Sequence, residues 1–175
     1  VKEVLWELLA ALVSRPKIAD YLIRRAQRTP YFNLPGYMNR NWLFNPYETE
    51  GPEAERHERK INWLPSIRIH HILRADEDRH LHDHPWNART IVLKNSYRER
   101  RLEDDSYIGP CPSEVGYIRK AGDTATLKYG EFHTIEWVSE GGVYTMFFTW
   151  DYVGTWGFLV DGVKIPWRAY LKEDV

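Results

Sequence analysis

The sequence of 175 residues contains a single cysteine, Cys111, and carries almost no net charge. One cysteine excludes an intramolecular disulfide framework, so a reducing cytoplasm is the expected location. A net charge of −1 provides no overall field that would attract nucleic acid or an anionic membrane. No apolar run has the length of a membrane span, and no signal peptide is visible. The sequence therefore predicts a cytoplasmic domain that binds neither nucleic acid nor membrane.

Several catalytic motifs are also missing. The chain has no glycine-rich phosphate loop, no Cys-x-x-Cys pair and no G-x-S-x-G nucleophile elbow. Cys111 has no histidine near it in the sequence and lies in a proline-rich loop, so it is not expected to be a nucleophile. Aromatic residues, in contrast, are abundant at 14%, with 8 Trp and 11 Tyr. Large rings pack cores and line binding pockets.

Histidines recur at every second position in residues 79–86, which read Arg-His-Leu-His-Asp-His-Pro-Trp. Alternate side chains of an extended strand share a face, so His80, His82 and His84 would point the same way. Neutral imidazole is the commonest protein ligand for zinc, iron, nickel and copper. A lone histidine is more often structural than a ligand, but three at this spacing favour a metal site. His80 is the spare ring, and it lies outside the site if the strand begins only at Leu81.

A distant partner is needed, because one strand rarely completes a metal site. Residues 122–133 predict a strand, a tight turn at Tyr129-Gly130 and a second strand that starts near His133. A histidine at that place can return to face the first cluster across a small barrel. The hypothesis is a centre formed by His82, His84 and His133, with coordination positions left open, as in catalytic sites.

The spacing of the predicted strands, joined by turn signals, indicates a mainly β chain with a single antiparallel jelly-roll barrel. Two short amphipathic helices are expected before it, at 2–14 and 16–28. The expected domains are a helical extension (1–28), an aromatic and proline-rich arm packed on the barrel (29–62) and the barrel itself (63–175). In the arm, Arg40 and Trp42 are assigned to packing rather than to a pocket wall.

The first strand is expected at 63–75. The other predicted strands are 90–98, the paired strands 115–120 and 123–128, and then 133–138, 143–150, 154–160 and 163–166. Residues 101–114 are predicted to form a long loop, 139–142 a hairpin turn and 161–162 another turn. A charged turn is expected at 53–60, with His57 exposed.

At the histidine segments the sequence resembles the cupin superfamily over roughly residues 64–160. The first cupin motif keeps His82 and His84, and the second keeps Gly122, Gly130 and His133 in register. The sequence His-Asp-His-Pro-Trp, with the later Trp156-Gly-Phe and Trp167, is similar to small, mostly uncharacterised cupins of bacteria and their phages.

The chain also departs from the cupin motifs. In the first motif, Asp76 stands at the leading glycine, Ala88 or Arg89 at the usual glutamate, and Asn95 or Ser96 at the trailing glycine. In the second, Lys128 replaces the proline and Trp137 the asparagine. The centre would therefore consist of histidines without a carboxylate.

The resemblance implies a metal-dependent enzyme, most often an iron-dependent oxygenase and, after that, a metal-assisted isomerase or lyase. The expected cofactor is a divalent transition metal, with Fe(II) ahead of Zn, Ni and Mn, and the expected ligand is a small polar or carboxylate molecule. Two alternatives stay open: a non-catalytic module that binds a small ligand, and a phage-encoded accessory protein. Cupins commonly dimerise through an extra strand or arm, so residues 29–52 are the expected contact of a homodimer.

The candidate pocket residues are His70, His80, Trp86, Arg89 and Tyr97. In the strand at 63–75, His70 and His71 point to opposite faces. Periodicity groups His71 with the apolar set, whereas the resemblance favours His70 as the inward residue; the sequence leaves this choice open. Trp86 is expected to close one end of the site. If Arg89 points inward it would favour an anionic ligand such as a carboxylate, and the alternative is a surface arginine.

Overall fold

The computed structural model describes residues 2–47, 59–103 and 113–171. Cys111 and most of the charged turn predicted at 53–60, including His57, lie outside these ranges. No helix in the described part of the chain is both long enough and apolar enough to cross a membrane.

Two helices open the chain, as the periodicity predicts: α1 (Lys2–Val13) and α2 (Pro16–Ala26). Pro16 occupies the first turn of α2, where its missing N–H leaves no helical hydrogen bond unmade. Small and β-branched side chains of both helices are buried: Ala10, Val13, Ala19, Ile23 and Ala26. The larger apolar residues of α1 are not buried: Val4, Leu5, Leu8 and Leu12 are exposed.

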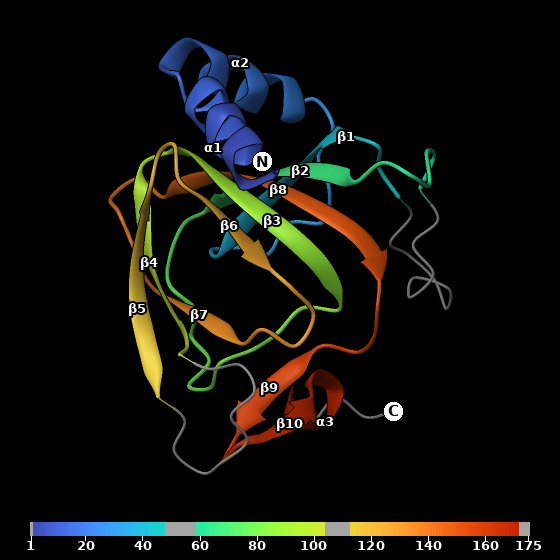
Figure 1. The fold of residues 1–175 in the computed structure, drawn as a ribbon, viewed down its shortest axis with the longest axis vertical. Helices are drawn as coiled ribbons and strands as arrows, with labels where there is room; N and C mark the ends of the chain where they lie inside the picture. The colour runs from blue at the N-terminus through green and yellow to red at the C-terminus, as the bar shows by residue number, and fades with distance from the viewer. Residues whose placement is uncertain (1, 48–58, 104–112, 172–175) are drawn as a thin grey trace.

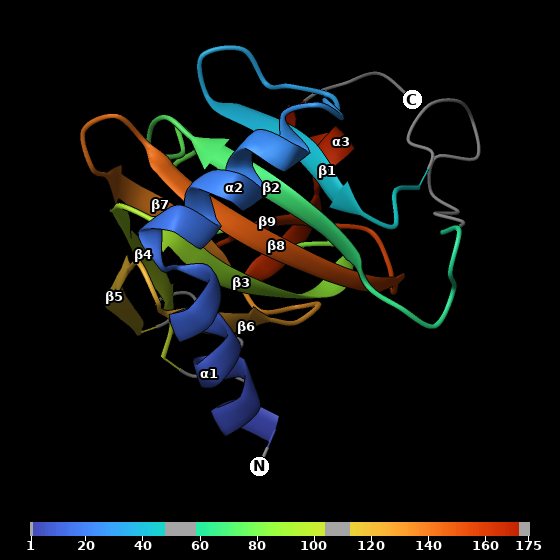
Figure 2. The same ribbon diagram turned by 90° about the horizontal axis from the view of Figure 1, so that it is seen from above.

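The larger sheet has five antiparallel strands in the order β1-β2-β8-β3-β6. Their bounds are β1 (Met38–Phe44), β2 (Ser66–Ile72), β3 (Trp86–Lys94), β6 (Thr124–Leu127) and β8 (Val143–Tyr152). Helices α1 and α2 cover one face of this sheet (Figures 1 and 2). The sequence pattern did not predict β1, which pairs with β2 at the edge of the sheet.

A second sheet has the order β5-β4-β7 and is formed by β4 (Ser96–Leu102), β5 (Glu114–Lys120) and β7 (His133–Val138). A two-stranded ribbon follows, with β9 (Gly157–Val160) and β10 (Val163–Pro166) joined by the predicted turn at Asp161-Gly162. The chain then forms a short helix, α3 (Trp167–Leu171), which was not predicted. Figure 1 shows the ribbon and α3 at the end of the molecule away from α1 and α2.

Three features differ from the predicted barrel. In the described part of the chain, the strands form separate sheets that do not close into one barrel. The strand predicted at 90–98 is broken at Asn95, whose φ of 67° turns the chain from β3 into β4 of the other sheet. The strands predicted to pair at 115–120 and 123–128 lie in different sheets, since β5 pairs with β4 and β6 pairs with β3.

Two predicted connections also differ from the structure. Residues 139–142 link β7 to β8 across the two sheets and do not form a hairpin. The loop predicted at 101–114 is shorter, because β4 continues through Leu102 and β5 begins at Glu114; residues 104–112 lie outside the described ranges. The outcome is a mainly β, antiparallel fold with few helices.

The two faces of the larger sheet have different chemistry. Ile69 and Ile91 belong to the core cluster that packs under the helices. Their neighbours along each strand point to the opposite face. These are Arg68 and His70 on β2 and Thr90 on β3, and they line a cavity. The apolar half of each strand therefore faces the helices, and the polar half faces the cavity.

Candidate metal centre and its cavity

The backbone brings the two histidine segments together. His82 and His133 form an isolated antiparallel bridge in which each N–H donates to the other residue's carbonyl, at 2.9 Å in both directions. On its other side, residue 82 bridges to Phe158 of β9. The short segment 81–83 is thus held between the start of β7 and the ribbon β9–β10, and His133 lies beside His82.

Asp83 fixes the orientation of its neighbours. Its carboxylate is fully buried, accepts a hydrogen bond from the Gly157 N–H at 2.8 Å and contacts Lys164 Nζ at 2.5 Å. These contacts turn the Asp83 side chain toward the ribbon. Because neighbouring side chains of an extended segment alternate, His82 and His84 then point the other way, toward His133.

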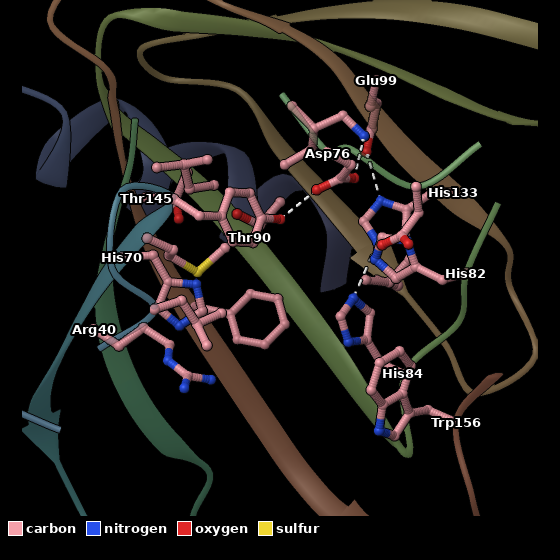
Figure 3. A pocket seen from close by; sticks show the side chains of 18 of the residues that line it. Arg40, His70, Asp76, His82, His84, Thr90, Glu99, His133, Thr145 and Trp156 are labelled. Carbon is pink, nitrogen blue, oxygen red and sulfur yellow. Dashed lines mark hydrogen bonds and ion pairs between the residues drawn. The ribbon is translucent and has the colours of Figure 1, made fainter. Parts of the chain in front are cut away.

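The three rings meet at one place in the cavity wall (Figure 3). The centroid of the His133 ring lies 4.8 Å from that of His82 and 5.2 Å from that of His84. The Nε2 atoms of His84 and His133 are 3.0 Å apart, and one candidate ligand atom from each of the three residues lies within 4.8 Å of the others.

These distances fit a shared metal ion. Two nitrogens bound to one ion by bonds of about 2.1 Å lie roughly 3 Å apart when the bonds are at right angles. The Nε2 atoms of His84 and His133 already have this separation, and a ligand atom of His82 lies within 4.8 Å of the other two. Nδ1 of His82 is buried and has no hydrogen-bond partner in the described part of the chain, so an ion would supply what it lacks.

The rings of His82 and His84 are neutral at physiological pH. Burial, and after it the charge of His133, lowers the pKa of His82 to about 4. Burial likewise holds the pKa of His84 well below its usual value, with His133 and His82 adding to the effect. A neutral imidazole keeps the lone pair that binds a metal. Both rings are therefore available as ligands near pH 7.

Glu99 of β4 stands behind His133. Its carboxylate is buried, with Oε1 2.7 Å from Arg119 Nε and Oε2 3.2 Å from Arg101 Nη2. Oε2 is also 3.6 Å from Nδ1 of His133 (Figure 3). Burial raises the pKa of Glu99, but the His133 ring and the two guanidinium groups outweigh it and lower the pKa to about 2.

This charge lies beside Nδ1 of the ring and favours one of its tautomers. A carboxylate beside Nδ1 favours the form in which Nδ1 carries the proton, so the lone pair stays on Nε2. Nε2 is the atom that faces His84. The buried network around Glu99 therefore favours an unprotonated Nε2 on His133, the form that could bind a metal.

The cavity next to the three rings has a volume of about 600 Å³. Aromatic walls dominate around the histidines: the rings of Trp86 and Phe147 lie 6.1 Å and 6.2 Å from His84, and that of Trp156 lies 6.4 Å from His82. Such walls exclude water and leave a few polar groups to orient a ligand.

The choice between His70 and His71 is settled by the sheet. His70 is buried, lines the cavity and stacks on Phe147 at 4.9 Å. His71 lies on the other face, where it stacks on Tyr144 and bonds to the carbonyl of Gly141. Periodicity correctly grouped His71 with the apolar set, but that set faces the helices.

The other candidate pocket residues divide into two groups. Trp86 and Tyr97 line the cavity. His80 does not, and its Nδ1 lies 3.0 Å from the Tyr170 hydroxyl near α3. Arg89 does not line the cavity either, and it is buried at 4% exposure, so both alternatives, an inward arginine for an anionic ligand and a surface arginine, are wrong.

Arg89 instead binds helix α1. Its Nη2 donates to both carboxylate oxygens of Glu3, at 2.7 Å and 2.8 Å, and its guanidinium lies over the Trp6 ring. Arg89 shares the phase of Ile91 and Leu93 on β3, which are buried under the helices. The alternation in the sequence could have predicted this placement, since Arg89, Ile91 and Leu93 lie on one face of the strand.

The sequence analysis missed charged residues that line the cavity, among them Arg40, Arg68 and Glu99. Arg40 lines the cavity and is not only a packing residue. Arg68 could have been found, because it shares the strand phase of His70. Glu99 shares the strand phase of Tyr97, but the charged run Arg98-Glu-Arg-Arg101 hid this signal, because such a run is typical of a solvated strand.

Comparisons with known proteins concern the fold. No family model matches the sequence, and no curated protein is significantly similar to it. Oxalate decarboxylase of Bacillus subtilis, in a structure that concerns its Mn(II) centres, matches with a TM-score of 0.50 and 11% identity over 87% of this chain and 33% of that chain. This likeness supports a cupin-like fold, and at such identity it does not extend to the reaction.

Two further similar structures are the hydroxypropylphosphonic acid epoxidase from S. wedmorenis and the capsular polysaccharide assembling protein CapF from Staphylococcus aureus. The epoxidase matches with a TM-score of 0.44 and 12% identity, over 71% of this chain and 56% of that one. CapF matches with a TM-score of 0.48 and 10% identity, over 70% and 28%. The chain thus spans about half the length of the epoxidase. Fold and site together describe a cupin-like β protein with a three-histidine cluster that could hold a metal.

Proposed function

We propose that this protein is a metal-dependent enzyme whose centre is formed by His82, His84 and His133, and that it converts a small polar or carboxylate substrate in the adjoining cavity. The observation that carries the proposal is the 3.0 Å separation of the Nε2 atoms of His84 and His133, with His82 beside them in the wall of a large cavity. We place Fe(II) first among the metals, with an oxygenase reaction as the favoured class.

The donor set supports this choice. A divalent ion held by three neutral imidazoles keeps its full charge and open coordination positions, so it would supply Lewis acidity and, as iron, a site for dioxygen chemistry. The chain's own residues do the rest. Glu99 favours the His133 tautomer with the proton on Nδ1, and the rings of Trp86, Phe147 and Trp156 lie beside the histidines, where they would exclude water from a bound substrate.

The first experiment measures the metal directly. Protein without a histidine tag is purified and analysed for metals by mass spectrometry, then stripped and reconstituted anaerobically with Fe(II), Mn(II), Ni(II) or Zn(II). We expect about one ion per chain in the wild type and a loss of binding in His133→Ala. His80→Ala is the matched control, because His80 bonds to Tyr170 and does not line the cavity.

The second experiment separates enzyme from binder. Oxygen uptake is followed in the Fe(II) form with a panel of small thiols and carboxylates. Uptake that disappears in His133→Ala supports the enzyme. Tight metal binding without turnover by any metal form supports a non-catalytic binding module, and a chain that takes up no metal supports an accessory protein that keeps only the fold.

A further inference from the structure

Arg68 is a buried cation without a counter-charge. Its side chain is 1% exposed and lines the cavity from the middle of β2. Within the described ranges no Asp or Glu forms an ion pair with it, and its Nε and Nη2 atoms have no hydrogen-bond partner. A guanidinium is permanently charged, and burying it unpaired is unfavourable.

Aromatic rings surround this charge. The Arg68 Cζ atom lies 5.1 Å from the centroid of Trp86 and 5.4 Å from those of Trp42 and Phe147. Tyr31 and Tyr47 lie slightly farther away, at 5.6 Å and 5.7 Å. The faces of these rings attract a cation, which explains how Arg68 is tolerated inside. They do not accept the N–H groups of Nε and Nη2, which lie in the plane of the guanidinium.

Nε and Nη2, both buried and without a hydrogen-bond partner among the described residues, occupy one edge of that plane. Nε and the adjacent Nη2 form the side-on fork that takes both oxygens of a carboxylate. Arg40 adds a second cation to the same cavity, on β1, where it pairs across the strands with His70. In Figure 3, Arg40 and His70 lie across the cavity from the histidine cluster.

Shared rings connect this part of the cavity to the three histidines. Trp86 lies under the Arg68 guanidinium and stacks on His84, with ring planes 16° apart. Phe147 contacts Arg68, His70 and His84. A molecule anchored at Arg68 can therefore lie along these rings and present its other end to the cluster.

We propose that Arg68 is the carboxylate-binding group of this cavity, with Arg40 as a second positive charge, and that it orients a small carboxylic acid with an apolar or aromatic body toward the three histidines. This proposal deepens the proposed function, on which its meaning for catalysis rests. The binding of the anion itself needs no metal, so it can be tested separately.

The test uses metal-free, chelator-treated protein and follows the thermal midpoint and calorimetric binding of sodium benzoate and sodium acetate at constant ionic strength against chloride. We expect a saturable rise of the midpoint with carboxylate, stronger for benzoate because its ring fits the aromatic walls. In Arg68→Met we expect binding at least about tenfold weaker, because a bidentate charged contact is lost. Arg68→Lys, which keeps the charge but not the fork, should be intermediate.

Arg98→Met is the matched control, since Arg98 points outward on β4 and pairs with Glu136. Its carboxylate affinity should equal that of the wild type. A second readout is the stability of Arg68→Met without added anion, which should match or exceed the wild type because an unpaired buried charge is removed.

The proposal is overturned if carboxylates bind Arg68→Met as tightly as the wild type, or if they protect the wild type no better than chloride. It is also overturned if phosphate at equal ionic strength binds and carboxylates do not. Should Arg68→Met fail to fold, the decision rests on Arg68→Lys, whose unchanged affinity would count against the fork. None of these outcomes depends on whether the histidines hold a metal.

Discussion

Replacing Glu99 by glutamine tests whether the buried carboxylate positions a metal ligand or only supports the fold. Glu99→Gln keeps the size of the side chain but removes the charge that faces Arg101, Arg119 and His133. A pKa that falls from 4.5 to about 2 on folding corresponds to roughly 3 kcal/mol of stability at neutral pH. Removing one partner of a buried ion pair commonly costs about 3–5 kcal/mol, which agrees.

Two quantities are measured for Glu99→Gln. Urea unfolding of the metal-free protein should show a loss of about 3 kcal/mol at pH 7. The difference from the wild type should shrink as the pH falls from 4.5 through about 2, because a carboxyl group with a depressed pKa loses its contribution there. Metal affinity, measured by competition with a chromophoric chelator, should fall about 10- to 100-fold, as for other groups that orient a ligating histidine.

Glu136→Gln is the control for this prediction. Glu136 lies on the outer face of β7 and pairs with Arg98 and Arg100 at 3.1 Å and 3.5 Å. A partly exposed pair of this kind contributes about 0.2–1 kcal/mol, so stability and metal affinity should change little. The reasoning about the tautomer is refuted if Glu99→Gln is unstable but, while still folded, binds metal as tightly as the wild type.

Three more predictions follow from the geometry. The metal-free protein should lose stability as the pH falls from about 6.5 toward 4, since the unfolded chain takes up a proton at His82 before the folded chain does; a flat urea midpoint over this range would contradict the depressed pKa. Gly157→Ala should destabilise by several kcal/mol, on the order expected for overpacking, because its Cβ would lie 2.2 Å from the Ile165 carbonyl oxygen; an unchanged thermal midpoint would refute this. Arg89→Met should lower stability through the lost contact with α1 while metal affinity stays unchanged, and weaker metal binding would place Arg89 in the site after all.

The alternation of apolar and polar residues predicted which side chains share a face of the larger sheet. On β2 and β3, the apolar phase that contains Ile69 and Ile91 was visible in the sequence, as was the polar phase that contains Arg68 and His70. The pattern cannot say which phase faces a cavity, because helices and a cavity wall both bury residues. Only the packing of α1 and α2 on the apolar phase made His70 the inward residue.

The strand boundaries failed where the chain changes sheets. Residues 90–98 contain no glycine or proline, so periodicity runs straight through Asn95. Asparagine tolerates a positive φ, and this local freedom lets β3 leave one sheet while β4 enters the other. The chain changes sheets again between β5 and β6, which are neighbours in the sequence but pair with different strands.

The sequence by itself determined the two helices, most of the strands and the identity of the three candidate histidines, because these depend on local periodicity and on residue chemistry. His82 and His84 share a face of one extended segment, and His133 opens a later strand. The tertiary structure alone decided that the three rings meet, that Glu99 stands behind His133 and that Arg68 is left without a counter-charge. These features arise between strands from different sheets or distant segments. Residues that are remote along the chain become neighbours only when burial and register are satisfied together.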